Sequence, residues 1–342
     1  MDKVKQIIFT KPFCAEYLDV LERDFTDIKE NEVVVKTVYS TISAGTERAN
    51  FVGEKAVSVF SDAEVPFPRT VGYSSAGDVV AVGKNVSKVK VGDRVVVYWG
   101  KHVNYNIVPE ANVVKIESEN VSYQEAAVAL IATFPLAAIR KVNLEIGESM
   151  IVMGLGILGQ LAVMLARSAG AYPIIACDPV EERREEALKN GADFALDPTK
   201  EGFSDKVKEI CSGGVKTAIE VTGLGVGLNQ TLDCMAKLGR VALLGCTRSS
   251  DFTVDYYHKV HGPGITLVGA HTSARPERES YPSYFTHDDD IKVVLNLCGG
   301  GRLPISNLIK EIVAPKDCQV VFDRLATDRK FPIGVQFDWT KE

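Results

Sequence analysis

Hydrophobic and polar positions follow two different patterns along the chain, and the change comes near residue 149. Before it, β-branched runs bounded by Gly, Asp and Asn predict strands, most clearly at 32–39, 76–83 and 91–98. After it, short apolar runs alternate with helical segments. This alternation predicts an α/β fold with a doubly wound parallel sheet. We expect strands at 150–154, 173–178, 194–197, 217–221, 240–245 and 265–269, with helices near 158–169, 181–190, 204–212 and 228–237.

The segments around this alternating region carry signals of their own. Ser122-Tyr-Gln-Glu125 fits a capping box, and we expect the apolar helix that follows it to run from Ala126 to Lys141. Gly170 and Gly191 stand where helix C-caps are expected. A last helix is predicted near 288–297, and the run 334–339 is typical of a strand.

Composition narrows the class of protein. A chain of 342 residues favours two domains over one core. The net charge of −6 argues against a nucleic-acid or anionic-membrane partner. The chain has no apolar run of membrane-spanning length and no signal-peptide core at its start, so we expect a cytoplasmic protein. Seven scattered cysteines without a CxxC pair fit reduced thiols rather than disulfides or a zinc knuckle.

One stretch indicates a ligand directly. An apolar run from Ser149 leads into Gly154-x-Gly156-x-x-Gly159, and an apolar helix start follows. The first glycine permits a tight turn, the second lets backbone N–H groups approach a pyrophosphate, and the third allows close helix packing. The helix start at Ile157 and Leu158 would face the pyrophosphate. A glycine turn in an unliganded α/β domain is the alternative.

Asp178 ends the next apolar run and bears on the choice of dinucleotide. A carboxylate there accepts the ribose hydroxyls of NAD and repels the 2′-phosphate of NADP, so NAD is favoured. Pro179 follows it and is included in the predicted cofactor site. Arg183 either stacks on the adenine or is a solvated charge among its acidic neighbours.

The motifs together resemble the medium-chain dehydrogenase/reductase superfamily, which is alcohol dehydrogenase-like. Residues 70–83 look like its P-G-H-E-x-x-G-x-V-x-x-V-G stretch, 91–95 like its G-D-R-V turn, and 220–223 like its cofactor-proximal turn. The resemblance implies a GroES-like catalytic domain at 1–135 and 298–342 around a Rossmann domain at 136–297. It also implies a homodimer or homotetramer, and cofactor contacts at Thr133, Thr222, Gly223, Gly245, Cys246 and Ala270.

The chain departs from this family where zinc-dependent members hold their metal. Ser43 or Ala44 stands at the position of the first cysteine ligand, and Tyr73-Ser74 replaces the His-Glu pair. Residues 129–133 offer no Cys, His or carboxylate, and no cysteine lies between Val97 and Pro109. Because zinc needs three or four N, S or O ligands, we predict no metal site. Ser-x-x-Ser-x-Gly-Thr-Glu at 40–47 is similar to a zinc-lacking branch that includes bacteriochlorophyllide dehydrogenase-like proteins.

Without zinc, hydride transfer from an alcohol requires hydrogen-bond donors and a general base. Tyr73 stands at the old histidine position, where its phenol either meets the substrate oxygen or fills the vacated space. Thr46 matches the family's proton-relaying hydroxyl, or caps a turn. Glu47 matches an acid behind the ligands, and either orients Tyr73 or Arg48 or forms a structural ion pair. Ser43 joins this candidate catalytic set.

Two of the five histidines are further candidates for catalysis, since imidazole titrates near neutrality. His102 lies where the missing metal lobe would rejoin the chain, and His271 follows the run 266–270. Each either contacts the substrate or is a loop or core histidine. His258 and His261 are spaced for a metal pair on a helix, but no third ligand is evident, so surface histidines are favoured.

These observations predict an NAD(H)-dependent oxidoreductase acting on a secondary alcohol or ketone without zinc. The hydroxyl and imidazole groups assigned to the site favour a small polyhydroxylated substrate, such as a sugar or cyclitol. A zinc-free quinone or enone reductase is the alternative within the class. A nucleotide-binding protein that has lost catalysis is the alternative outside it.

Overall fold

The computed structural model describes residues 2–54, 58, 64–248 and 252–341. The chain divides into two compact units. Unit 1 comprises residues 1–131 and 291–342, and unit 2 comprises 132–290. From the sequence we expected the same division of the chain, with the borders at 135/136 and 297/298 instead.

Unit 2 is built on a six-stranded parallel sheet, as the alternating pattern predicts. The strand order β11-β10-β9-β12-β13-β14 is that of a doubly wound sheet, with strands added outward on both sides of β9. The runs of β9 and β10 are apolar throughout because these central strands are buried on both faces. The strands are β9 (Met150–Met153), β10 (Ile174–Cys177), β11 (Phe194–Leu196), β12 (Val215–Glu220), β13 (Met235–Leu243) and β14 (Thr266–Gly269).

The helices of unit 2 follow the predicted positions with one correction at α7. That helix was expected to reach residue 237, but it ends at Asp233, and β13 begins at Met235, paired with Val215. Its apolar residues near the end therefore belong to the sheet, which short apolar runs do not distinguish from a helix. The other helices of this region are α4 (Ile157–Ala169), α5 (Glu181–Lys189) and α6 (Phe203–Ile210), with α7 spanning Gly225–Asp233.

The helix expected from Ala126 to Lys141 is broken. Ser122 and Glu125 form the predicted capping box, but the helix it starts is only α2 (Tyr123–Ala126), and α3 (Ala129–Lys141) is separate. The carbonyl of Ala127 accepts hydrogen bonds from the Thr41 hydroxyl at 2.8 Å and the Ser74 hydroxyl at 2.7 Å. At the break, the Ala127 carbonyl therefore accepts hydrogen bonds from side chains of the neighbouring sheet instead of from the backbone of a continuing helix.

Unit 1 is mostly β, in agreement with the prediction, and its predicted strands at 32–39, 76–83 and 91–98 are confirmed as β3, β5 and β6. Its larger sheet has the order β15-β16-β3-β5-β6-β8, with β7 also paired to β3, and its smaller sheet has the order β2-β1-β4. The strands are β1 (Asp2–Lys11), β2 (Cys14–Arg23), β3 (Glu32–Thr41), β4 (Arg69–Thr70), β5 (Ser74–Val82), β6 (Arg94–Tyr98), β7 (Tyr105–Pro109), β8 (Val113–Lys115), β15 (Ile309–Val313) and β16 (Gly334–Asp338).

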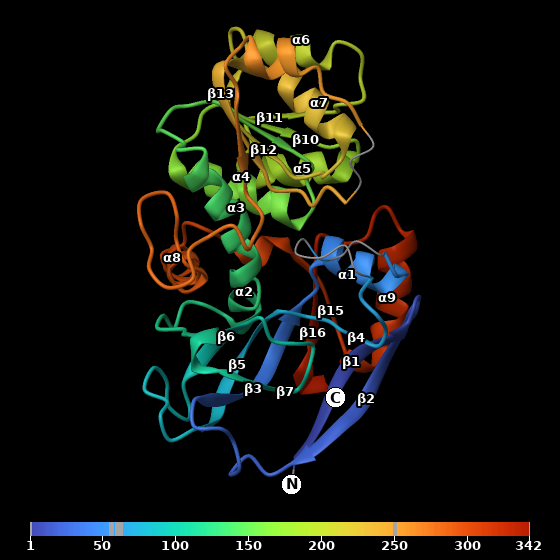
Figure 1. Ribbon diagram of the computed structural model, residues 1–342, viewed down its shortest axis with the longest axis vertical. Coiled ribbons are helices and arrows are strands. Elements are labelled where there is room, and N and C mark those ends of the chain that lie inside the picture. Colours follow the sequence, from blue (N-terminus) through green and yellow to red (C-terminus); the bar gives the residue numbers. More distant parts are fainter. Residues whose placement is uncertain (1, 55–57, 59–63, 249–251, 342) are drawn as a thin grey trace. The chain divides into compact units, whose positions relative to one another are not determined.

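Two helices of unit 1 lie against each other, although they are far apart in the sequence (Figure 1). They are α1 (Ala44–Val52) and α9 (Cys318–Thr327). Phe51 of α1 and Phe322 of α9 enclose Phe9 of β1, with ring centroids 5.2 and 4.7 Å from the Phe9 ring. Helix α1 was not expected within the β-rich part, and the candidate residues Thr46 and Glu47 lie on it.

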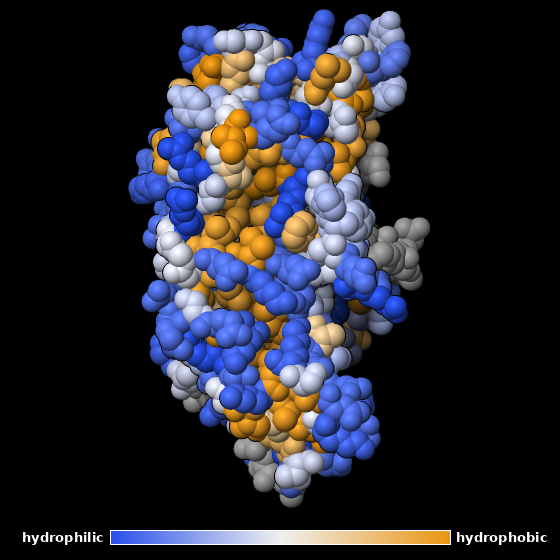
Figure 2. All heavy atoms as spheres, turned by 90° about the vertical axis from the view of Figure 1, so that its left-hand side faces the viewer, coloured by the Kyte–Doolittle hydropathy of each residue, from blue (hydrophilic) through white to orange (hydrophobic). Residues whose placement is uncertain are grey.

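The surface mixes hydrophilic and hydrophobic residues, as Figure 2 shows for one face. The longest helices are α3, α4 and α8 (His287–Gly299), of 13 residues each. Within the described residues, no helix has both the length and the apolar character needed to cross a bilayer.

Candidate active site

The glycine loop of unit 2 joins β9 to α4, and each of its glycines has a different reason to be there. Gly154 has φ +96°, which L side chains rarely adopt. A Cβ on Gly159 would overlap the carbonyl oxygen of Gly154, so this helix turn packs directly on the loop. A Cβ on Gly156 would meet no atom within 4 Å. The fold therefore requires the first and third glycines, whereas the second keeps the approach to the helix open.

The start of α4 offers the anion site that this opening leads to. Gly156 caps the helix without a side-chain hydrogen bond. The N–H groups of Ile157 and Leu158 belong to the first turn, where helix geometry provides no intrahelical acceptor. Unpaired N–H groups and the helix dipole favour a pyrophosphate there.

Asp178 is buried beside the glycine loop and is held by it. One carboxylate oxygen accepts the Leu155 N–H and the other accepts the Val180 N–H, both at 2.8 Å. Arg183 lies 3.7 Å from the carboxylate, so it is an ion-pair partner rather than a solvated charge. Arg184 donates to the carbonyl oxygen of Pro179 at 2.9 Å. Each carboxylate oxygen thus accepts one backbone N–H and has the capacity to accept a second hydrogen bond.

The turns after β12 and β13 meet beside the first glycine. A Cβ on Gly154 would lie 3.0 Å from Cγ2 of Thr222, one on Gly223 would lie 2.6 Å from the Cys246 carbonyl oxygen, and one on Gly245 would overlap Gly223. Four of the predicted cofactor residues are thus brought together at the carboxyl edge of the sheet, where doubly wound folds bind ligands.

Glu220 organises these turns, and the sequence reasoning did not select it. Its carboxylate accepts the N–H of Thr222 at 2.8 Å and of Gly223 at 3.1 Å, and it also bonds the Thr222 hydroxyl. Burial raises the pKa of this carboxyl group despite these hydrogen bonds. The signal was an acid at the end of a buried strand, inside a motif already noted for its glycine.

The residues after β14 complete the same edge. The buried Ala270 donates its N–H to Leu243 at 3.0 Å, which fixes the start of the loop. His271 is partly exposed, and its Nδ1 lies 2.7 Å from the Ser273 hydroxyl. Burial, and after it the charge of Lys141, lower the pKa of His271. A neutral imidazole is therefore available there near pH 7.

Thr133 does not fit the predicted cofactor contact. Its side chain is fully buried and its hydroxyl lies 3.4 Å from Nδ1 of His287, while its carbonyl accepts a hydrogen bond from Arg275 at 3.0 Å. No surface of Thr133 is left to meet a ligand in this structure, so this assignment is corrected.

In unit 1, Tyr73 and Ser43 form a hydroxyl pair. The phenol of Tyr73 donates a hydrogen bond to Oγ of Ser43. Ser43 is the N-cap of α1, but its side chain makes no capping bond. The Trp99 ring lies 5.5 Å from the Tyr73 ring, is 43% exposed and belongs to a residue with φ +58°. A bulky residue at positive φ is uncommon and often marks a functional position.

Glu47 lies behind this pair and binds His102. One carboxylate oxygen accepts the Ser43 N–H at 2.9 Å, and the other lies 2.9 Å from Nε2 of His102. Arg48 instead pairs with Glu54 at 3.8 Å. Of the alternatives stated above, the structure therefore favours a structural role for Glu47, which is hydrogen-bonded to His102 and to the Ser43 N–H rather than to Tyr73 or Arg48.

His102 is a core histidine, and the prediction that it contacts substrate is wrong for this structure. Its side chain has no exposed surface, and its Nδ1 lies 2.7 Å from Oγ of Ser40. Nε1 of Trp339 donates to the same Oγ at 2.8 Å. Neither Ser40 nor Trp339 was predicted from the sequence. Ser40 is the first residue of the motif at 40–47, and Trp339 has no local signal because it lies 299 positions from Ser40.

Thr46 lies in the first turn of α1 and is partly buried, and its carbonyl oxygen accepts a hydrogen bond from Asn50 at 3.0 Å. Its predicted relay role stays a prediction. His258 and His261 are both exposed, and Asp255 lies 2.9 Å from Nδ1 of His258.

The residues at the family's metal position do not fit zinc. The family resemblance implies Ser43 or Ala44 at one ligand position and Tyr73 at another, and the hydroxyls of Ser43 and Tyr73 bond each other. In the part of the chain that the structure describes, no three His, Cys, Asp or Glu side chains converge as a metal group. Zinc sites are built from thiolate, imidazole and carboxylate ligands, and neutral hydroxyls are poor substitutes.

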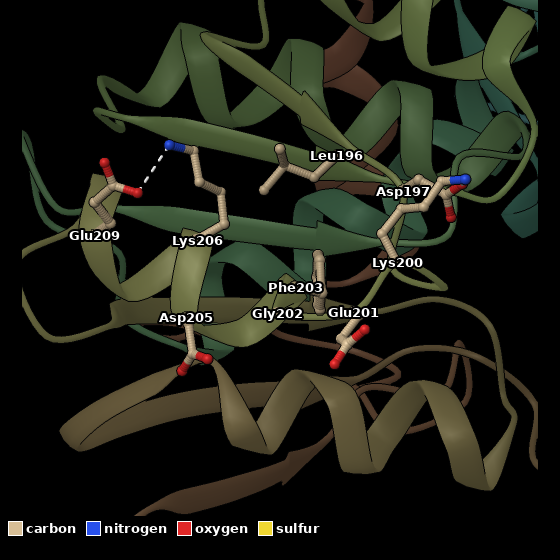
Figure 3. Close-up of a pocket in the computed structure, with 9 residues that line it drawn as sticks. All are labelled: Leu196, Asp197, Lys200, Glu201, Gly202, Phe203, Asp205, Lys206 and Glu209. Carbon is tan, nitrogen blue, oxygen red and sulfur yellow. Dashed lines mark hydrogen bonds and ion pairs between the residues drawn. The ribbon is translucent and has the colours of Figure 1, made fainter.

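A surface hollow of about 470 Å³ lies beside α6 in unit 2 (Figure 3). Lys206 and Glu209 form an ion pair across part of it at 2.8 Å. Acidic residues outnumber lysines in its lining, which does not suit a pyrophosphate. None of the predicted site residues lines it, so we do not assign the active site there.

Comparison with known proteins agrees with this geometry. Residues 29–120 match the model of the alcohol dehydrogenase GroES-like domain, and residues 158–287 match that of the zinc-binding dehydrogenase. The chain belongs to the medium-chain dehydrogenase/reductase superfamily. Within this alcohol dehydrogenase-like superfamily, the chain is an oxidoreductase of the pyridine-nucleotide-dependent type.

The curated relatives include enzymes for different hydroxyl compounds. L-threonine 3-dehydrogenase of Pyrococcus abyssi is 28% identical over 305 residues, which is 78% of this chain and 83% of the relative. D-guloside 3-dehydrogenase of Escherichia coli is 25% identical over 303 residues, which is 82% of this chain and 84% of the relative.

Solved structures share the whole fold at low identity. Galactitol-1-phosphate dehydrogenase from Escherichia coli superposes with a TM-score of 0.84 at 16% identity, covering 98% of this chain and 99% of that one. 2R,3R-butanediol dehydrogenase from Bacillus subtilis has a TM-score of 0.80 at 22% identity, with the same coverage.

Proposed function

We propose that this protein is an NAD(H)-dependent dehydrogenase that interconverts a secondary alcohol and a ketone without catalytic zinc. The observation that carries the proposal is the Tyr73–Ser43 hydroxyl pair, which occupies the family's metal position in a chain that retains the dinucleotide loop. The chemistry supplied by bound NAD⁺ is acceptance of a hydride from the carbon that carries the substrate hydroxyl.

Asp178 supports the choice of NAD. Its carboxylate is buried and fixed by two backbone N–H groups, so it does not move aside for a 2′-phosphate. Ile157, Leu158 and the three glycines would hold the pyrophosphate. Thr222, Gly223, Gly245, Cys246 and Ala270 are the proposed contacts along the same edge.

The Tyr73–Ser43 pair would bind the substrate oxygen and exchange its proton. A phenol and a hydroxyl can each donate and accept, so the pair would take up the alcohol proton as the carbonyl forms and release one of its own protons towards the nicotinamide ribose and water. Thr46, at the start of the same helix, remains the proposed relay for that proton. His271 is proposed as a neutral hydrogen-bond partner for the substrate.

A polyhydroxylated substrate, such as a sugar or cyclitol, fits unit 1 best. Trp99 presents an exposed indole next to Tyr73, and the aliphatic face of a sugar ring packs well on such a surface. The named relatives that act on threonine and on a guloside agree with a secondary hydroxyl group. A quinone or enone reductase is the second candidate, but it usually uses NADPH, which Asp178 disfavours.

The deciding experiment is a turnover screen with a metal analysis on the same sample. Purified protein is mixed with NAD⁺ or NADP⁺ and with sugars, cyclitols, simple secondary alcohols, threonine and, in the reverse direction, quinones. We expect NAD⁺-dependent oxidation of a polyol, with full activity retained after treatment with a strong chelator. Stoichiometric zinc that is needed for turnover would refute the zinc-free proposal.

Two further outcomes separate the alternatives. Turnover confined to quinones or enones would favour the reductase. Tight NAD⁺ binding without turnover on any compound would favour a nucleotide-binding protein that has lost catalysis. We also propose a homodimer or homotetramer, which light scattering on the same sample measures.

A further inference from the structure

A buried series of polar side chains in unit 1 leads from Trp339, just after β16, to the hydroxyl pair. It links Trp339 to Ser40 at 2.8 Å, Ser40 to His102 at 2.7 Å, and His102 to Glu47 at 2.9 Å. Glu47 in turn accepts the Ser43 N–H at 2.9 Å. Each of these residues is less than 9% exposed. A polar network at this depth costs stability unless every group is paired, so its retention calls for an explanation.

The donors and acceptors of this series permit one consistent arrangement for a neutral imidazole. The indole N–H of Trp339 can only donate, so it must point at the Ser40 oxygen. The Glu47 carboxylate can only accept, so Nε2–H of His102 donates to it, which leaves Nδ1 to accept the proton of the Ser40 hydroxyl. One oxygen of the Glu47 carboxylate then accepts from His102 and the other accepts from Ser43.

The effect of this series falls on the N-cap of α1. A serine at that position normally bonds the helix N–H groups with its own hydroxyl. Here Glu47 binds the Ser43 N–H, and the Ser43 hydroxyl makes no capping bond and accepts from Tyr73. The buried carboxylate thus fixes the main chain of Ser43, while the Ser43 side chain is engaged by Tyr73 instead of the helix.

We infer that Glu47, His102, Ser40 and Trp339 are positioning residues for the Tyr73–Ser43 pair. They hold the Ser43 hydroxyl against Tyr73 and keep a fixed negative charge behind it. That charge opposes loss of a proton from the pair and makes the pair a stronger proton acceptor. This inference rests on the proposed function, in which the pair exchanges a proton with the substrate.

The test uses Glu47→Gln with Glu125→Gln as its matched control. Glu125 makes the same kind of bond, to the N–H of the N-cap residue Ser122 at 3.0 Å, but at α2. For Glu47→Gln we expect kcat to fall about 100-fold with an unchanged KM for NAD⁺, as for loss of a general acid–base group. We also expect the pH of half-maximal rate to move down by about one unit, because a nearby negative charge is removed. Glu125→Gln should change none of these three quantities.

A second variant separates geometry from charge. Trp339→Phe keeps an aromatic ring in the core but removes the N–H that orders Ser40. We expect about a fivefold lower kcat, the size of one lost neutral hydrogen bond of about 1 kcal/mol. The pH profile should stay in place, since no charge is lost. This variant also serves if Glu47→Gln does not fold.

A measurement without turnover keeps the inference separable from the proposed function. The ¹³Cζ signal of Tyr73 in the full-length protein should titrate at a lower pH in Glu47→Gln than in Glu125→Gln, and the ¹⁵N shifts of His102 should show the Nε2–H tautomer. The positioning role would be overturned if Tyr73 titrated at the same pH in both variants. It would also be overturned if the two variants lost kcat and melting temperature to the same extent. Absence of turnover in the unaltered protein, with the titration difference present, would overturn the proposed function alone.

Discussion

The glycine loop of unit 2 and the hydroxyl pair of unit 1 are built in opposite ways. The loop is contiguous in sequence, and its function rests on backbone groups that any glycine-rich turn of this geometry exposes. The pair depends on side chains from β3, α1, the turn before β5 and the chain after β16. A site made of backbone groups tolerates sequence changes elsewhere in the chain. A site made of converging side chains depends on every element that carries one of them.

The largest effect is expected from the glycines, and it sharpens this comparison. Gly159→Val places a branched side chain onto the Gly154 carbonyl, so we expect a loss of about 3 kcal/mol in the free energy of unfolding. Gly156→Val meets open space and should fold normally, but it should weaken NAD⁺ binding at least 100-fold. Urea denaturation and calorimetric titration measure the two quantities. Equal stability of the two variants would contradict the roles assigned to these glycines.

The next effect tests the side-chain site. Tyr73→Phe removes the phenol hydroxyl and keeps the ring beside Trp99, so we expect kcat to fall 100- to 1000-fold. The affinity for NAD⁺ should remain within twofold, because the glycine loop is untouched. Steady-state kinetics and fluorescence titration check both values. Retention of more than half the rate would remove Tyr73 from the mechanism.

A smaller change is expected from the acid beside the loop. Asp178→Asn keeps the shape of the side chain but removes its charge, so we expect the ratio of kcat/KM for NADP⁺ to that for NAD⁺ to rise about tenfold. The neutral amide no longer repels the 2′-phosphate of NADP⁺ as the carboxylate does. An unchanged ratio would show that Asp178 does not select the cofactor.

The smallest effect compares the buried His102 of unit 1 with the partly buried His287 of unit 2. His102 has a carboxylate partner, whereas burial and the nearby charge of Arg275 lower the pKa of His287 to about 3. Below pH 6.5, the ordinary histidine pKa, His287 binds a proton in the unfolded chain but stays neutral in the folded protein. Acid therefore destabilises the fold between about pH 6.5 and 3.

The lowered pKa of His287 predicts how the stability of His287→Leu depends on pH. At pH 5 the unaltered protein should lose about 2 kcal/mol that it has at pH 8, from 1.4 kcal/mol per pKa unit. The variant should lose less over the same interval, whatever its stability at pH 8. Urea denaturation at the two pH values measures the difference. An equal loss in both proteins would assign the acid sensitivity to other groups.

The sequence predicts the fold well where the pattern is local. The parallel sheet of unit 2, the glycine loop and the capping box at Ser122 all follow from spacings of a few residues. The errors have tertiary causes. The helix break after Ala126 depends on Thr41 and Ser74, and the early end of α7 depends on pairing between β12 and β13.

For the candidate site too, the sequence predicted the residues that belong to local motifs and missed those brought in by tertiary contacts. Sequence motifs identified the turns that meet at Gly154, because each turn follows a strand whose carboxyl end must lie at one edge. They also identified Ser43, Glu47 and Tyr73. They misplaced His102 and did not find Ser40 or Trp339, since no local pattern shows that residues 40, 102 and 339 belong to one buried series.

The discontinuity of unit 1 also orders events during synthesis. Ser40 and His102 leave the ribosome early, but Trp339 follows only after all of unit 2 has been made. Unit 2 is a single contiguous segment and has what it needs to fold as soon as it emerges. Unit 1 must wait with the end of β3, residues 39–41, lacking the partner that β16 later provides. The newly made chain therefore acquires its cofactor loop first, and it completes the hydroxyl pair's support last.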